Sequence, residues 1–107
     1  GLSEAAMKRA ATKGDGWCSD SHTTEDLQRI VVELRRRRAE SERAGKPFAV
    51  LAACADAFDI DGYRRAGEAG VTHLMTMPWY LYGGGETLSG KVDAIRRFGD
   101  DIIAKIR

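Results

Sequence analysis

Three aromatic side chains followed directly by a glycine run are the residues of this chain best suited to ligand binding. Trp79, Tyr80 and Tyr82 precede Gly83-Gly84-Gly85. Aromatic rings at such a position could form the wall of a site for a flat substrate or cofactor, and a glycine run gives a lid its mobility. Packing of the same rings in a core or an interface explains them equally well, so both interpretations stay open.

The first three residues are a second candidate site, for a phosphate. Gly1, Leu2 and Ser3 precede a stretch rich in alanine that predicts a helix. Free amides and the helix dipole at a helix N-terminus suit a phosphate group, and the Ser3 hydroxyl would add a donor. The simpler alternative is that Ser3 only caps the helix.

The histidines and cysteines predict neither a metal site nor a nucleophile. His22 and His73 are far apart, and no cysteine or carboxylate stands near them at the spacing of metal ligands. Cys18 and Cys54 form no C-x-x-C motif and have no evident base partner. We therefore expect both to be free thiols in a reducing cytoplasm.

Charge excludes a general attraction to nucleic acid or to anionic membranes. Of the 107 residues, 17 are Lys or Arg and 16 are Asp or Glu, which gives a formal net charge of +1. The run from Arg35 to Arg38 is surrounded by Glu33, Glu40 and Glu42 at pairing distances along a helix. The sequence therefore predicts a solvated, salt-bridged helix there. No apolar run approaches the roughly 20 residues of a membrane span.

The elements that must position the candidate residues alternate between helix and strand. Leu27, Ile30, Val31 and Leu34 form one apolar helical stripe, and the apolar run at residues 48–54 is typical of a parallel strand covered on both faces. Gly70 predicts the end of a helix. The expected helices are residues 4–13, 24–45, 59–69 and 88–105, and the expected strands are 17–18, 48–54 and 71–77.

This order predicts a single α/β segment over residues 1–107 with about three parallel strands and four helices. A sheet of three parallel strands has two bare edges, which are a liability for a free domain. We therefore expect the isolated chain to associate, either with itself as a homo-oligomer or with strands that it lacks. The segment Asp15-Gly16-Trp17 is predicted to be a tight turn, with Trp17 in the core.

Ordered segments along the whole chain resemble the C-terminal part of the luciferase-like monooxygenase family, most closely its branch that uses the deazaflavin coenzyme F420. The similar segments are residues 1–6 and 9–11 leading to Gly14-Asp15-Gly16-Trp17, residues 24–27 with Leu34, Arg35 and Pro47-Phe48, residues 63–65 and 68–74, Met77-Pro78-Trp79, and residues 91–93 and 95–98. The charged stretch at residues 35–46 departs from the family's pattern.

The resemblance implies the last βα units of a TIM (β/α)8 barrel, which is incomplete here because a whole barrel needs about 250 residues. It further implies an oxidoreductase that transfers a hydride between F420, or alternatively FMN, and a small organic substrate. In that family, the turn matching Gly1, Leu2 and Ser3 lies near the cofactor phosphate. Catalytic residues would lie upstream, so the isolated chain is expected to be inactive. The alternative is a noncatalytic, self-associating α/β module without a cofactor.

Overall fold

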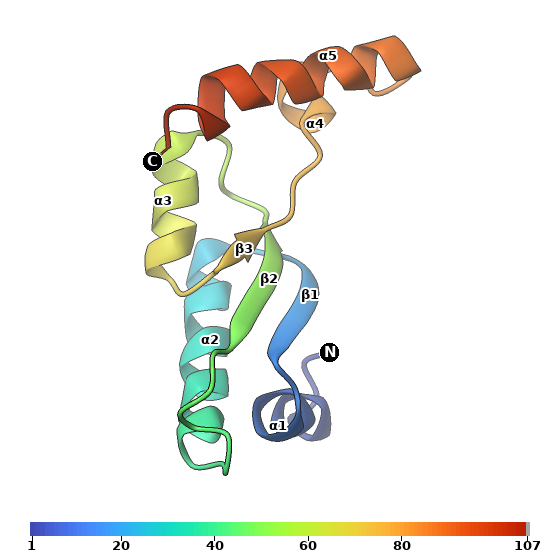
Figure 1. Ribbon diagram of the computed structural model, residues 1–107. Helices are drawn as coiled ribbons and strands as arrows, with labels where there is room; N and C mark the ends of the chain where they lie inside the picture. Colours follow the sequence, from blue (N-terminus) through green and yellow to red (C-terminus); the bar gives the residue numbers. More distant parts are fainter. Residues whose placement is uncertain (107) are drawn as a thin grey trace.

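The computed structural model describes residues 1–106 and arranges them as alternating helices and parallel strands (Figure 1). This confirms the predicted α/β class and the three parallel strands. The elements, in chain order, are α1 (Glu4–Lys13), β1 (Gly16–His22), α2 (Thr24–Ala39), β2 (Ala49–Cys54), α3 (Ile60–Glu68), β3 (His73–Leu74), α4 (Trp79–Tyr82), α5 (Leu88–Phe98) and the π-helical turn η1 (Gly99–Ile103).

The sheet has the order β1-β2-β3, with β2 in the middle. Trp17 is paired with Val50, and Leu51 with His73. The outer edge of β1 is seven residues long, whereas β3 contributes only two residues. The outer edge of the sheet is therefore long at β1 and short at β3, because the chain leaves the sheet after Leu74.

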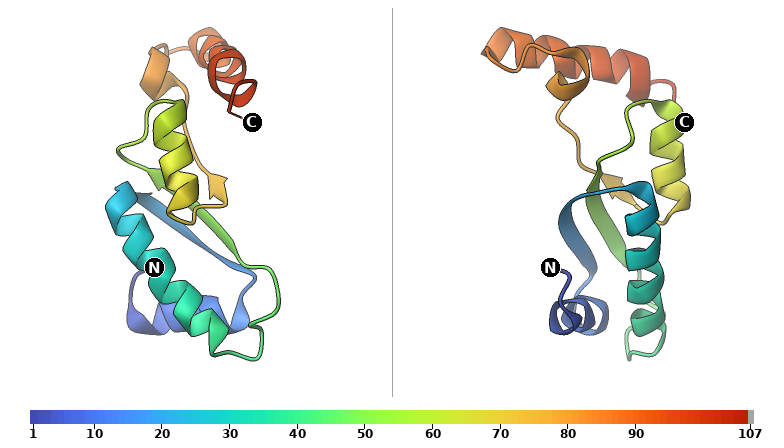
Figure 2. Two further views of the ribbon diagram at one scale, coloured as in Figure 1. Left: turned by 90° about the vertical axis from the view of Figure 1, so that its left-hand side faces the viewer. Right: turned by 180° about the vertical axis from the view of Figure 1, so that it is seen from behind.

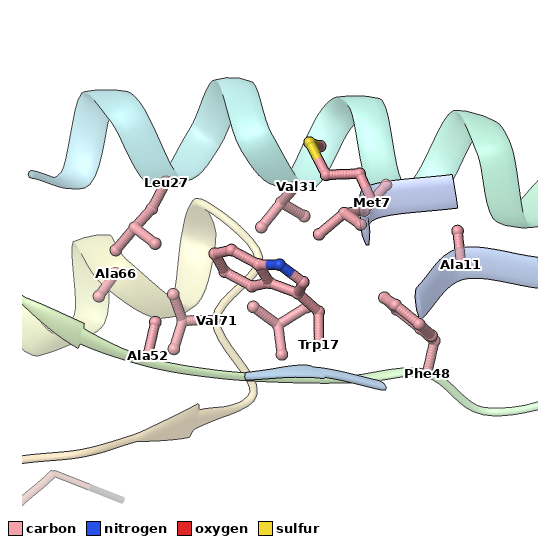
Figure 3. Close-up of a cluster of buried hydrophobic side chains, with 11 residues drawn as sticks. Met7, Ala11, Trp17, Leu27, Val31, Phe48, Ala52, Ala66 and Val71 are labelled. Atoms are coloured by element: carbon pink, nitrogen blue, oxygen red, sulfur yellow. The ribbon is translucent and has the colours of Figure 1, made fainter. Parts of the chain in front are cut away.

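The main core lies on one face of the sheet, beneath α1, α2 and α3 (Figures 2 and 3). Trp17 is buried in it, as predicted, together with Leu27, Leu34 and Val50. Side chains alternate along a strand, so the residues between the buried ones of β2 point to the opposite face. That face stays partly exposed at Leu51 and Ala53. The expectation that β2 is covered on both faces is thus wrong for the described residues.

The segment from α4 to η1 lies at the carboxyl ends of the strands (Figure 1). A smaller apolar cluster of Ala57, Tyr63, Phe98 and Ile102 joins α3 to this part. Two elements of this part differ from the prediction. Residues 79–82, for which no helix was expected, form the short helix α4, and the last helix changes to π-helical geometry at Gly99 instead of continuing to Lys105.

The predicted solvated, salt-bridged helix is confirmed for its ion pairs but is wrong for the exposure of one arginine. Arg36 and Arg37 do form ion pairs with Glu33, at 2.6 and 2.9 Å, and these guanidinium groups lower the pKa of Glu33 to about 2. Arg38, however, is buried. Its guanidinium donates hydrogen bonds to the carbonyl oxygens of Ala11, Gly14 and Pro47. The helix ends at Ala39 and not near Gly45.

Candidate functional site

A groove of about 380 Å³ lies at the carboxyl ends of the strands, and we name it the strand-end groove. Asp20 and Ser21 line it from the end of β1, residues 53–55 from the end of β2, residues 75–77 from the segment after β3, and Tyr80 from α4. In parallel α/β proteins, and in (β/α)8 barrels above all, ligands bind beyond this end of the strands. The fold thus puts the groove at the position where chemistry is expected.

Water-exposed apolar side chains gather in this groove. Within residues 1–106, nine large hydrophobic side chains are exposed, and four of them line it: Phe58 (65%), Met75 (43%), Met77 (43%) and Tyr80 (75%). Leaving such surface in water is unfavourable, and contiguous apolar patches mark binding sites. The groove is therefore suited to a flat or apolar ligand, with Asp20 and Ser21 as the polar groups beside it.

The three aromatic residues predicted to form a wall have different surroundings. Tyr80 lines the strand-end groove. Trp79 instead faces Lys91, whose ammonium lies 5.1 Å from the centre of the indole ring. The Tyr82 hydroxyl donates a 3.0 Å hydrogen bond to Asp101, and the guanidinium of Arg97 lies over its ring at 4.2 Å. Trp79 and Tyr82 thus hold α4 against α5 and η1, while Tyr80 remains available to a ligand.

The glycine run makes a turn that lies against the start of α5. Gly83 and Gly84 have φ angles of 79° and 85°, which favour glycine. The backbone of Gly84 approaches Gly90 so closely that a Cβ at position 90 would collide with the Gly84 carbonyl oxygen. The Thr87 hydroxyl accepts a 3.0 Å hydrogen bond from the Gly90 amide and so caps α5. A shallow hollow of about 790 Å³ beside this turn shares Tyr80 with the strand-end groove.

A polar network next to the groove had not been predicted from the sequence. The Thr24 amide and hydroxyl both donate to one oxygen of Asp56, at 2.9 and 2.8 Å, and these bonds lower the pKa of that carboxyl. The Cys54 thiol also donates to Asp56, at 3.2 Å. Burial raises the pKa of Cys54, so the thiol stays protonated near neutral pH and is a poor nucleophile. The network ties the start of α2 to the end of β2.

The turn of Gly1, Leu2 and Ser3 lies away from this groove. Gly1 lines a hollow beside Gly16 and Trp17 at the beginning of β1, and its carbonyl oxygen accepts a 3.2 Å hydrogen bond from the Trp17 indole. The Ser3 hydroxyl accepts a 3.2 Å hydrogen bond from the Ala6 amide, as an N-cap does. The described residues therefore do not bring the predicted phosphate turn together with the aromatic wall, and phosphate binding by this turn stays a prediction.

The hydrogen bond of the Ser3 cap leads to a prediction about the free energy of unfolding. Replacing Ser3 with alanine removes the acceptor of the Ala6 amide and should lower the free energy of unfolding by about 1 kcal/mol. Urea denaturation followed by circular dichroism measures this change. The matched variant Ser3→Asp keeps an acceptor at the cap and should stay within about 0.3 kcal/mol of the original chain. Equal losses in both variants would contradict the cap.

The histidines make local contacts. His22 forms a 3.0 Å hydrogen bond with Ser19 and stacks on Trp17, and His73 forms a 2.8 Å hydrogen bond with Thr72. Across residues 1–106, no group of three or more His, Cys, Asp or Glu side chains is arranged to hold a metal ion. Cys18 and Cys54 are free thiols. None of the helices within that range is both long and apolar enough to cross a membrane.

Comparison with known proteins shows similarity to proteins that have no assigned activity. Three mycobacterial proteins described as uncharacterized, one from Mycobacterium bovis and two from strains of Mycobacterium tuberculosis, are each 29% identical to the chain over 109 residues. The match covers 99% of this chain but only 37% of each relative, so the chain spans little more than a third of the length of these relatives. No family model and no solved structure matches.

Proposed function

We propose that the chain is the C-terminal segment of a luciferase-like oxidoreductase that transfers a hydride between F420, or alternatively FMN, and a small organic substrate. The observation that carries the proposal is the strand-end groove. Its exposed Tyr80 and Phe58 rings and the side chains of Met75 and Met77 offer apolar surface to a planar ring system at the end of the strands where (β/α)8 barrels build their active sites.

The uncovered face of the sheet supports the barrel part of the proposal. In a barrel, helices cover the outer face of the strands and further strands enclose the inner one, and α1, α2 and α3 lie on one face only. A match of 109 residues that spans 37% of a relative corresponds to a relative of about 290 residues. That length accommodates a complete barrel of about 250 residues.

The groove fits the ring of such a cofactor better than its phosphate. Its walls are mainly apolar, and none of the residues 1–106 that line it carries a cationic side chain. When bound, the cofactor supplies the hydride chemistry, while the chain's own residues hold its ring and exclude water. Because Ser3 caps α1 at the other end of β1, the proposal rests on the groove and not on the turn of Gly1, Leu2 and Ser3.

Cofactor titration tests the proposal. In the complete gene product, F420 or FMN should bind, and Tyr80→Ala should weaken the affinity about tenfold because the exposed ring wall is lost. Fluorescence titration measures both dissociation constants. The matched control is Tyr82→Phe, which keeps a ring outside the groove and should leave the affinity unchanged.

Two outcomes would contradict the proposal. One is a complete gene product that binds neither F420 nor FMN, and the other is equal affinity in the Tyr80→Ala and unsubstituted proteins. If binding is absent and sedimentation shows a homo-oligomer, the alternative of a noncatalytic, self-associating α/β module is favoured, because association would cover the bare β1 edge and the groove.

A further inference from the structure

Sulfur-containing side chains gather at the strand-end groove. The chain has three methionines and two cysteines, and Cys54, Met75 and Met77 all line this groove. Met75 and Met77 are each 43% exposed, whereas Met7 is 8% exposed and packs in the main core. Both exposed methionines of the chain therefore belong to the candidate site.

Backbone hydrogen bonds hold the two methionines at the groove. The Met75 amide donates a 3.0 Å hydrogen bond to the carbonyl oxygen of Ala52 in β2. The Met77 carbonyl oxygen accepts a 2.9 Å hydrogen bond from the amide of Tyr80 in α4. Their exposure thus follows from the position of the segment between β3 and α4, which is tied to the fold on both sides.

The thioethers differ from the thiol of the same groove in their readiness to react with an oxidant. A thiol reacts as its thiolate, but burial raises the pKa of Cys54, and its thiol donates a 3.2 Å hydrogen bond to Asp56. The thiol is therefore held in its less reactive, protonated form. The thioethers of Met75 and Met77 have no proton to lose, so their lone pairs are available at any pH.

Oxidation by hydrogen peroxide changes the chemistry of a thioether wall. The sulfur lone pair bonds to one peroxide oxygen, the O–O bond breaks, and the second oxygen leaves as water with both protons. Sulfur is oxidised, the peroxide is reduced, and the product is a polar sulfoxide. Burying the sulfoxide oxygen against an apolar ring without a hydrogen-bond donor is unfavourable. Methionine sulfoxide reductases restore the thioether, so the change is reversible.

We propose that Met75 and Met77 form an oxidation-sensitive switch in the strand-end groove. The groove binds a planar, apolar ring when both side chains are thioethers and releases it when both are sulfoxides. The switch rests on the proposed function for the ring as the ligand of the groove, and it adds a means of regulating that site.

Indole is a neutral, planar probe for the groove, and the methionine methyl groups report on its binding. In the 107-residue chain labelled with carbon-13 at these methyl groups, indole should shift the NMR signals of Met75 and Met77 and leave that of Met7 unchanged. Dilute hydrogen peroxide should oxidise Met75 and Met77 at least about tenfold faster than Met7, because susceptibility follows exposure. Peptide mass spectrometry measures these rates. Oxidation of both should lower the affinity for indole about tenfold.

Leucine variants separate the switch from other effects of peroxide. Leucine keeps apolar surface of similar volume and has no sulfur. The double variant with Met75→Leu and Met77→Leu should therefore bind indole and keep its affinity after peroxide treatment. It retains Cys18, which is exposed, so oxidation of this thiol would not explain a difference. Met7→Leu is the matched control and should lose affinity on oxidation as the original chain does.

Three results would overturn the switch. They are methyl signals of Met75 and Met77 that do not respond to indole, equal oxidation rates for Met7 and the exposed pair, and an indole affinity that survives complete conversion to the sulfoxides. The cofactor titration of the complete gene product distinguishes this failure from failure of the proposed function. If F420 and FMN do not bind but indole binding responds to peroxide, the proposed function is wrong and the switch is retained.

Discussion

Replacing Arg38 with methionine should lower the free energy of unfolding by about 3 kcal/mol, because three carbonyl oxygens lose their donor at once. The Arg38 guanidinium donates to Gly14 at 2.6 Å, to Ala11 at 3.0 Å and to Pro47 at 3.1 Å. Its planar group also lies 5.0 Å from the centre of the Phe48 ring. Methionine keeps much of the side-chain length and apolar surface, so the loss reports the hydrogen bonds more than the packing.

Arg36→Met is the matched control for this prediction. Arg36 lies on the same helix, but its ion pairs with Glu33 and Glu40 are exposed to solvent. Exposed pairs contribute roughly 0–1 kcal/mol, so this variant should differ little from the original chain. Chemical denaturation of the two variants measures the difference. Similar stabilities for Arg36→Met and Arg38→Met would show that the buried guanidinium has no special role.

We expect the loss of the Arg38 hydrogen bonds to affect the strand-end groove as well. Gly14 and Pro47 stand just before β1 and β2, so the bonds from Arg38 hold the beginnings of the two strands beside each other. Gly16 pairs with Ala49 immediately afterwards. The pairing of β1 with β2 continues to Ser21 and Ala53 at the groove, with a shift of register between Cys18 and Ser21. We expect Arg38→Met to loosen this pairing and so to broaden the NMR signals of groove residues as well.

A signal for the burial of Arg38 is present in the sequence. Leu27, Val31, Leu34 and Arg38 follow one another at spacings of four, three and four residues, so Arg38 continues the buried stripe of α2. Neighbouring helical residues point about 100° apart, which separates Arg38 from Arg37. Its partners could not be foreseen, because they are backbone carbonyls 9 to 27 residues away whose position depends on the tertiary fold.

The fold was predictable where local chemistry determines it. The apolar run at residues 48–54 and the stripe of α2 are local patterns, and both elements are present. The groove was only partly predictable. Tyr80 was among the candidates, but its separation from Trp79 and Tyr82 depends on contacts that α5 and η1 make. Met75 and Met77 join the groove because the chain leaves the sheet after β3, which the pattern of residues 71–77 did not indicate.

Gly70→Ala should also lower the free energy of unfolding by about 3 kcal/mol, from a strained φ angle together with a steric clash. Gly70 has a φ of 108°, and its Cβ would stand 2.5 Å from Cγ1 of Val31 in α2. The Gly70 amide donates to Gly67 and the Val71 amide to Ala66, the two hydrogen bonds of a Schellman motif. Relieving the clash requires either this motif or the contact between α2 and α3 to move.

Gly67→Ala separates that effect from the general cost of a methyl group. Gly67 lies three residues earlier, within α3, and a Cβ there meets no atom within 4 Å. Alanine should therefore stabilise the chain by up to about 1 kcal/mol through helix propensity. Thermal unfolding of both variants should show opposite shifts in melting temperature. Shifts of the same sign would contradict the strain and the clash with Val31 that we assign to position 70.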